Sequence, residues 1–178
     1  VLDILYSSEL DARRGFYRSS YINENGTENW VASTQFSPID ARHALICYDE
    51  PKWRAIFSVS IQHGKSYHAL SNMPMSNLSE VAGTEYVITK FHDSLSMQSY
   101  LLALAISNFD YIPNNDVDVP QRIYAKKSSI MNGEANFIIN ELGPILKKCD
   151  ELFGIPHALP KLDHIAVPYH VYSAMENY

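Results

Sequence analysis

The fold class of this 178-residue chain is decided by the stretch Trp53-Arg54-Ala55-Ile56-Phe57-Ser58-Val59-Ser60-Ile61-Gln62-His63. Apolar residues occupy every second position from Trp53 to Ile61, and most of the residues between them are polar. Side chains alternate between the two faces of an extended strand, so this pattern predicts a half-buried β-strand. A turn at Gly64-Lys65 follows, and residues 66–72 are expected to return as the second strand of a hairpin.

Other segments extend the β pattern along most of the chain. Residues 84–92 are rich in Tyr, Val, Ile, Thr and Phe, which favours another strand. Residues 100–106 are apolar on both faces and are expected in the middle of a sheet, although a run of this length also fits a buried helix. Residues 121–125 are expected to form one more strand.

The character of the sequence changes beyond an acidic, proline-bearing segment at residues 108–120. We therefore expect a domain boundary near Val119, between an N-terminal β domain at residues 1–118 and a second part at residues 119–178. In the second part, apolar residues recur at steps of three and four, which predicts an amphipathic helix. They are Ile138, Leu142, Ile145, Cys149 and Leu152.

The expected helix has a marked end and an interruption. Gly154 can adopt the left-handed conformation that closes a helix, whereas Pro144 removes one backbone hydrogen bond. The tail from His157 is expected to be extended loop and short strand.

Composition and charge exclude several classes of function. The chain carries 14 Lys plus Arg against 20 Asp plus Glu, and no basic run, so nucleic acid is not expected as a partner. Its longest apolar run, residues 100–106, is far shorter than the roughly 20 residues that cross a bilayer. Cys47 and Cys149 are too few for a disulfide framework. We expect them to be buried free thiols, with a mutual disulfide as the less favoured alternative.

Two N-glycosylation sequons favour an extracellular surface. Asn25 and Asn77 each stand two residues before a Thr or Ser, and neither is followed by Pro. The chain begins with Val1 and shows no secretory signal pattern, so we expect it to be a piece of a longer protein.

Common catalytic motifs are not found in the sequence. None of the seven His residues begins an H-E-x-x-H pair, and neither a G-x-S-x-G elbow nor a phosphate-binding glycine loop occurs. His164 and His170 lie six positions apart without an evident third ligand. Solvated or capping histidines are therefore favoured over a metal site.

Asp49 and Glu50 are two adjacent carboxylates held by the following Pro51. Side chains of adjacent residues do not converge well on one substrate atom, so catalysis is the less favoured interpretation. We expect a rigid turn whose acids accept hydrogen bonds or pair with Arg42 or Arg54.

Short motifs in a fixed order give the chain a resemblance to the aminopeptidase N family of zinc exopeptidases, over most of its length. They are Gly15-Phe16-Tyr17-Arg18-Ser19, Thr34-Gln35-Phe36, Asp40-Ala41-Arg42, Cys47-Tyr48-Asp49-Glu50-Pro51, Ala69-Leu70-Ser71-Asn72-Met73-Pro74, Ser99-Tyr100-Leu101-Leu102-Ala103, Leu159-Pro160-Lys161-Leu162-Asp163 and Ser173-Ala174-Met175-Glu176-Asn177. The resemblance implies a mainly β fold with a C-terminal α+β portion. A β-sandwich-like, saddle-shaped N-terminal domain would be followed by the start of a thermolysin-like catalytic domain, whose zinc-binding helix lies after the last residue given.

The same resemblance implies a substrate-binding site. Glu176 is similar to the family glutamate that binds the free α-ammonium group of the substrate, and Gln35 looks like the amide that assists it. The neighbours expected to align the substrate backbone and to wall the pocket for its first side chain are Ser173, Ala174, Met175 and Asn177. No metal ligand or catalytic residue is expected within the chain.

The leading hypothesis is a parent zinc metalloaminopeptidase that removes residues from peptides with free N-termini, with this segment supplying recognition and inactive alone. Ser173 replaces the usual glycine of the signature, and Tyr169-His170 stands where the family usually has Asp-Phe. These departures keep open a second hypothesis, a non-catalytic cell-surface binding protein or pseudoenzyme. An extracellular or cell-surface location with a membrane-anchored parent is expected. Protein ligands at the glycosylated surface and a homodimer of the parent are further alternatives.

Overall fold

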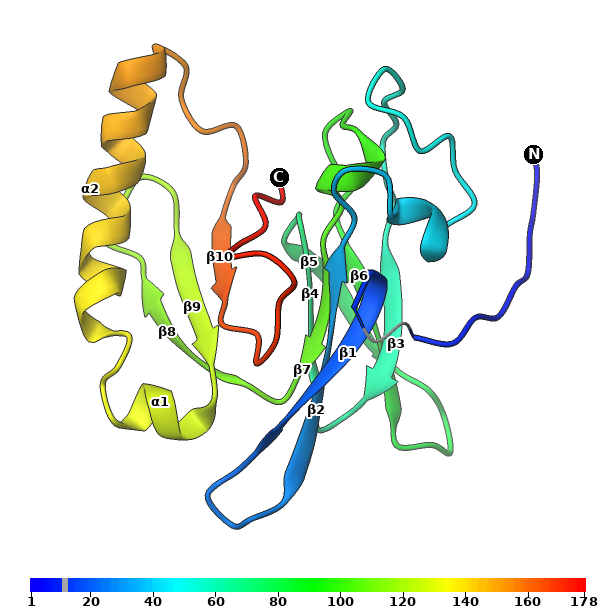
Figure 1. Cartoon of the computed structure of the whole chain (residues 1–178), viewed down its shortest axis with the longest axis horizontal. Coiled ribbons are helices and arrows are strands. Elements are labelled where there is room, and N and C mark those ends of the chain that lie inside the picture. Colours follow the sequence, from blue (N-terminus) through cyan, green and yellow to red (C-terminus); the bar gives the residue numbers. More distant parts are fainter. Residues whose placement is uncertain (11–12) are drawn as a thin grey trace.

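The computed structural model describes residues 1–10 and 13–178, which form mainly β-strands with one long helix (Figure 1). A four-stranded antiparallel sheet has the order β1-β2-β7-β4. Its strands are β1 (Gly15–Ile22), β2 (Glu28–Gln35), β4 (His68–Ser71) and β7 (Leu104–Ser107). The turn between β1 and β2 is closed by Asn23, whose side-chain oxygen accepts hydrogen bonds from the backbone N–H groups of Asn25 and Thr27.

A second, three-stranded antiparallel sheet has the order β3-β6-β5. Its strands are β3 (Ser60–Gly64), β5 (Met75–Glu80) and β6 (Tyr86–Phe91). Two short 3-10 helices, η1 (Ala41–His43) and η2 (Ser99–Leu101), contribute to a core cluster of Phe36, Ala41, Met97 and Leu102.

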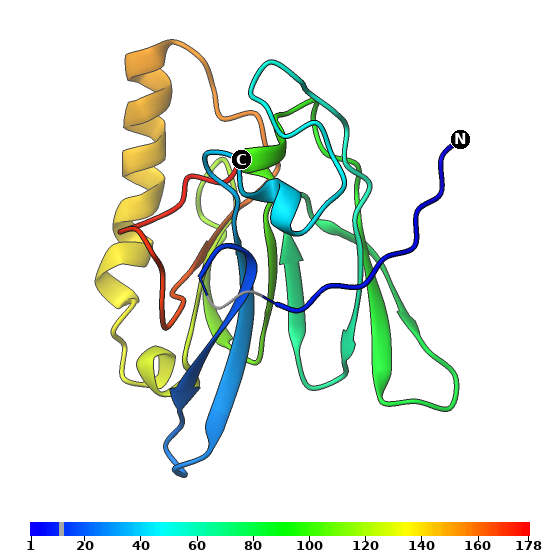
Figure 2. The ribbon, with the colours of Figure 1, turned by 45° about the vertical axis from the view of Figure 1, so that its right-hand side comes forward.

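The third sheet has the order β10-β9-β8 and contains a parallel pair. β8 (Asp110–Asn114) is antiparallel to β9 (Gln121–Ala125), whereas β10 (Leu162–Ile165) is parallel to β9. A parallel pair needs a crossover connection, and here it runs through α1 (Lys127–Met131) and α2 (Asn136–Phe153). Helix α2 lies along this sheet in both ribbon views (Figures 1 and 2).

The predicted helix is confirmed by α2, including its end. Gly154 has φ +66°, and its N–H donates to the carbonyl of Asp150 at 2.9 Å, as expected for a left-handed cap. Pro144 lies inside the helix. Ile139 packs with Ile123 and Ala135, so the helix and the third sheet share one small core.

The mainly β fold with a C-terminal α+β portion is confirmed, but the predicted hairpin is wrong. Within the quoted stretch only residues 60–63 form a strand, as part of β3 (Ser60–Gly64), and its partner is β6. Residues 66–72 contribute β4, which pairs with β7 in a different sheet. A period of two favours a strand, but here it overestimated the length of the strand, and it carries no information on which strand will pair with it.

Other expected strands are found with shorter bounds. Residues 84–92 contain β6, and residues 121–125 form β9. Within residues 100–106 the chain first completes η2 and then enters β7, which lies between β2 and β4 in the middle of its sheet. The expected boundary near Val119 falls in the loop between β8 and β9, two strands of one sheet, and stays a prediction.

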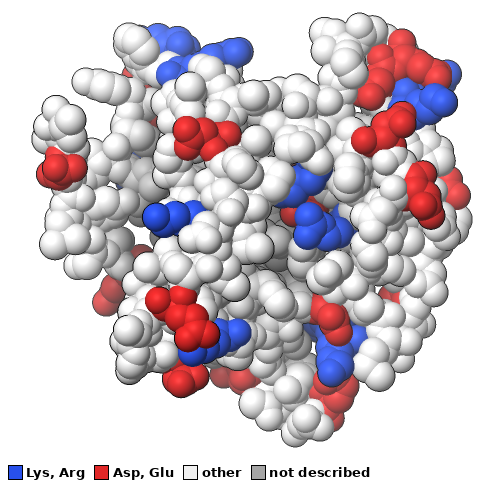
Figure 3. Space-filling view, turned by 180° about the vertical axis from the view of Figure 1, so that it is seen from behind, with Lys and Arg blue, Asp and Glu red and all other residues white. Residues whose placement is uncertain are grey.

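The surface carries charges of both signs. Figure 3 shows Lys and Arg side chains next to Asp and Glu side chains over one face of the molecule. None of the helices that the structure describes has the length and apolar character needed to span a membrane.

Candidate functional site

The last six residues, 173–178, lie between β10 and the four-stranded sheet (Figure 1). They line a cavity of about 610 Å³. Its other walls come from β2, β4 and β7 on one side and from β10 with its flanking residues on the other. The segment expected to bind substrate therefore borders a cavity together with strands that are distant in the sequence.

The expected substrate-binding residues of this segment all line the cavity. Ser173, Ala174 and Glu176 are exposed, whereas Met175 and Asn177 are half-buried. Within the described part of the chain, Glu176 forms no ion pair or hydrogen bond. Its carboxylate is thus free to take an external cation.

Gln35, by contrast, does not line the cavity, although its neighbours Ser33 and Thr34 do. It ends β2 and is only 2% exposed. Its side-chain N–H donates to the carbonyl of Ser37 at 3.2 Å, while its side-chain oxygen is buried with no hydrogen-bond donor among the described residues. No hydrogen bond joins Gln35 to Glu176 among the described residues, and of the two only Glu176 lines the cavity.

The two regions are connected by the backbone of residues 101–104. The hydroxyl of Thr34, next to Gln35, accepts a hydrogen bond from the N–H of Leu104 at 3.0 Å. The side chain of Asn177 donates to the carbonyl of Leu102, in the same stretch, at 3.2 Å. One stretch of main chain thus supports both the end of β2 and the residue after Glu176.

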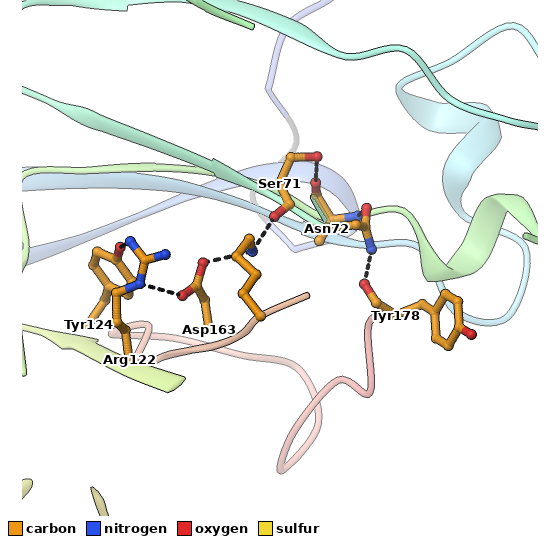
Figure 4. Close-up of polar contacts among 8 residues, drawn as sticks. Ser71, Asn72, Arg122, Tyr124, Asp163 and Tyr178 are labelled. Atoms are coloured by element: carbon orange, nitrogen blue, oxygen red, sulfur yellow. Dashed lines mark hydrogen bonds and ion pairs between the residues drawn. The ribbon is translucent and has the colours of Figure 1, made fainter. Parts of the chain in front are cut away.

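A charged network borders the same cavity through Lys161 and Asp163 (Figure 4). Lys161 Nζ is 2.7 Å from Asp163 Oδ2, and each side chain is 8% exposed. Arg122 Nε is 3.2 Å from the other carboxylate oxygen and Arg122 also donates to the hydroxyl of Tyr124. Lys161 in addition donates to the carbonyl of Ser71, at the end of β4, at 2.8 Å. The network therefore joins the third sheet to the four-stranded sheet.

Burial sets the protonation behaviour of this network. Loss of water lowers the pKa of the Lys161 ammonium, and the neighbouring Asp163 carboxylate partly opposes that shift. Burial raises the pKa of Tyr124 to about 12, and the negative charge of Asp163 adds to the rise. The pKa of His164 is lowered by burial, against a smaller opposing effect of Asp163.

The other acids and histidines singled out in the sequence have structural partners. Asp49 is buried and accepts hydrogen bonds from the backbone N–H of Arg42 at 2.9 Å and from the hydroxyl of Ser99 at 2.6 Å. It also pairs with the Arg42 guanidinium, which confirms the expected turn. His164 Nε2 lies 3.3 Å from the side-chain oxygen of Gln121.

Cys47 and Cys149 are both free, as predicted, but both are exposed, so their expected burial is wrong. Cys149 lies on α2, where Ile145 and Leu152 of the same apolar stripe are exposed as well. The period of the stripe predicted the helix, but within the described chain much of that stripe has no packing partner.

The described residues do not fit a zinc site. No group of three or more His, Cys, Asp or Glu side chains among them is arranged to hold a metal ion.

The charged network was not predicted from the sequence, although the sequence carries a signal for it. Lys161 and Asp163 are two positions apart in an extended segment, so their side chains lie on the same face. Opposite charges on one face, next to Leu162 and Ile165, favour an ion pair between the two side chains. Asn72 gave no comparable signal, because the partners of its side chain are main-chain atoms.

Comparisons with known proteins were consistent in the family that they identify. Residues 1–101 match the family described as the Peptidase M1 N-terminal domain. The chain is 40% identical to aminopeptidase Q of Acinonyx jubatus over 171 residues, 94% of this chain. It is 36% identical to aminopeptidase Ey of Gallus gallus over 177 residues, 98% of the chain. It is 38% identical to the human thyrotropin-releasing hormone-degrading ectoenzyme over 180 aligned residues, 99% of the chain. These matches span only 17%, 18% and 17% of the respective relatives.

Proposed function

The chain belongs to the peptidase M1 family, and we propose on that basis that it is part of a zinc aminopeptidase in which Glu176 binds the α-ammonium group of the substrate. Its relatives are peptidases by name, and the chain spans less than a fifth of their length. The catalytic part of the proposed enzyme is therefore expected in other segments of a longer protein. Zinc would polarise the scissile carbonyl and activate water there.

The observation that carries the proposal is the place of Glu176. Its carboxylate is exposed, has no partner within the described chain, and borders a cavity of about 610 Å³. An ammonium group at 4 Å from a carboxylate gains about 1 kcal/mol in water and about 4 kcal/mol at an effective dielectric of 20. The attraction therefore grows as substrate excludes water from the cavity. A blocked N-terminus carries no such charge, so the site would select free N-termini.

The remaining signature residues fit supporting roles in the same proposal. Met175 is half-buried at the cavity and would contact the first side chain of the substrate, a role that suits a flexible thioether. Gln35 has a buried oxygen without a donor, which is the kind of acceptor that an ammonium group could satisfy after a local rearrangement. We propose that residues 1–118 and 119–178 correspond to the two domains expected from the sequence.

The proposal also covers location. One relative is named an ectoenzyme, and this chain carries two sequons. Asn25 lies in the exposed turn between β1 and β2, and Asn77 is exposed on the edge strand β5. We propose that the protein acts at the cell surface or outside the cell, with glycans at these two positions.

The test uses the full-length protein and the variants Glu176→Ala and Glu176→Gln. We expect both to lower kcat/KM on an aminoacyl reporter by at least about 100-fold, since the ammonium anchor acts in ground and transition states alike. Glu141→Gln, an exposed acid on α2, is the matched control and should leave the rate unchanged. An unchanged rate in both Glu176 variants would remove this residue from the amino-binding role.

The alternative is a non-catalytic binding protein of the same family, motivated by Ser173 in place of the usual glycine. The two functions separate in one measurement. Full-length protein loaded with zinc that releases no product from any aminoacyl reporter, yet binds peptides with free N-termini, would favour the alternative.

A further inference from the structure

We propose that Asn72 is a positioning residue that holds the segment carrying Glu176 in the orientation needed to bind the substrate ammonium group. The inference rests on the proposed function of Glu176 and adds a residue to it. Asn72 follows directly after β4 and is 5% exposed.

The side chain of Asn72 joins three segments of the chain (Figure 4). Its oxygen accepts a hydrogen bond from the backbone N–H of Ala103 at 2.8 Å. Its NH₂ group donates to the carbonyl of Leu101 at 2.9 Å and to the carbonyl of Tyr178. The end of β4, the stretch before β7 and the end of the signature therefore meet at one amide.

The chemistry of these partners requires an amide. An Asn side chain offers two N–H donors and one carbonyl acceptor. Here the NH₂ group donates to two backbone carbonyl groups, and the side-chain oxygen accepts one hydrogen bond. A carboxylate at the same place would turn an oxygen toward the carbonyl oxygens of Leu101 and Tyr178. Those groups would repel each other, and the amide is buried enough that water could not easily take its place.

The contact lies where it can determine the position of Glu176. Glu176 has no hydrogen bond or ion pair of its own in the described chain, so its neighbours set its place. The following two residues are held on the same backbone: Asn177 donates to Leu102 at 3.2 Å, and the N–H of Tyr178 donates to Leu101 at 3.3 Å. Asn72 ties this arrangement to the four-stranded sheet.

The neighbouring residue strengthens the assignment. The carbonyl of Ser71 accepts the hydrogen bond from the buried ammonium of Lys161, and its hydroxyl donates to the carbonyl of Ala103. The end of β4 thus contacts Lys161, directly before β10, through Ser71, and the following residue Asn72 contacts the signature segment. Both contacts lie at the walls of the cavity that Glu176 borders.

The test compares ligands that differ only in the α-amino group. In the full-length protein, inhibition constants are measured for a competitive dipeptide and for its des-amino analogue. The constant of the analogue divided by that of the dipeptide reports the contribution of the ammonium contact. We expect Asn72→Asp to lower this ratio at least tenfold. An added negative charge alone would favour the ammonium group, so a fall in the ratio indicates displacement of Glu176.

The matched control is Asn108→Asp. Asn108 is also a partly buried amide that both accepts and donates side-chain hydrogen bonds, with Tyr21 and Asn29, but its partners are outside the cavity lining. We expect its ratio to stay within twofold of the wild type. If Asn72→Asp does not fold, Asn72→Ser takes its place, because a Ser hydroxyl cannot reach both carbonyl groups. We expect this variant to lower the ratio as well.

The outcomes separate this inference from the proposed function. A lower ratio in Glu176→Gln and in the Asn72 variants, but not in Asn108→Asp, supports both. A lower ratio in Glu176→Gln alone overturns the role of Asn72 and leaves the ammonium anchor standing. An unchanged ratio in Glu176→Gln overturns the anchor, and the positioning role falls with it.

Discussion

Replacement of Lys161 by Met tests whether the buried charged network holds two sheets together. The substitution keeps an unbranched side chain of nearly the same length. It removes the ammonium group that lies 2.7 Å from Asp163 and donates to the carbonyl of Ser71. Asp163 remains 8% exposed and keeps Arg122 at 3.2 Å as its remaining cationic partner. The substitution therefore lowers the free energy of unfolding because a buried carboxylate loses one of its two cationic partners.

The magnitude follows from these contacts. Breaking a buried ion pair by removing one partner costs about 3–5 kcal/mol. Because Arg122 stays, we expect the lower end, about 3 kcal/mol. With a urea dependence of about 2 kcal/mol per M for a small protein, the unfolding midpoint should fall by roughly 1.5 M.

The assay is equilibrium unfolding of the 178-residue chain in urea, followed by circular dichroism. The double variant Lys161→Met with Asp163→Leu replaces the pair by apolar groups and should recover to within about 1 kcal/mol of the wild type. Lys148→Met breaks an exposed pair with Glu151 and should cost at most about 0.5 kcal/mol. If Lys161→Met costs no more than Lys148→Met, the network does not join the sheets in the way described.

Three further predictions address pH, packing and modification. The folded state holds the pKa of His164 below 6.5, so the stability that His164 contributes is present above pH 6.5 and is lost as the pH falls toward the folded-state pKa. Between pH 7.5 and pH 5.5, the free energy of unfolding measured in urea should therefore fall less for His164→Gln than for the wild type. Gly143→Ala places a methyl group against the Val117 side chain and should cost about 1–3 kcal/mol, with Val117→Ala restoring part of it in the double variant. Protein secreted from mammalian cells should lose mass on glycosidase treatment, and Asn25→Gln and Asn77→Gln should each reduce that loss by one glycan. An unchanged mass after treatment would show that neither sequon is glycosylated.

The secondary structure was accessible to sequence reasoning wherever one element determines its own pattern. The apolar stripe from Ile138 to Leu152 predicted the helix, and Gly154 predicted its end, since both signals depend on residues a few positions apart. Strand pairing was not accessible in this way. β3 and β4 are separated by a short turn, but each pairs with a distant strand, because long-range burial and not the turn selects the partner.

In the candidate site, too, some features could be predicted from the residues and others could not. The signature segment could be located from its residues, and the structure places that segment along a cavity. The partners of Asn72 could not be found from the sequence, because backbone carbonyl groups are present at every position and leave no trace in the residue pattern. Gln35 was expected beside Glu176, and only coordinates could show that its side chain is buried and turned toward Ser37.

The backbone of residues 101–104 has a consequence for how this region can diverge among relatives. Thr34, Asn72 and Asn177 all bind its main-chain N–H and carbonyl groups, and none of these contacts uses a side chain of the stretch itself. Evolution can therefore exchange the side chains at 101–104, within the limits of packing, without loosening the support. The three polar residues that bind this backbone are instead expected to change together or not at all.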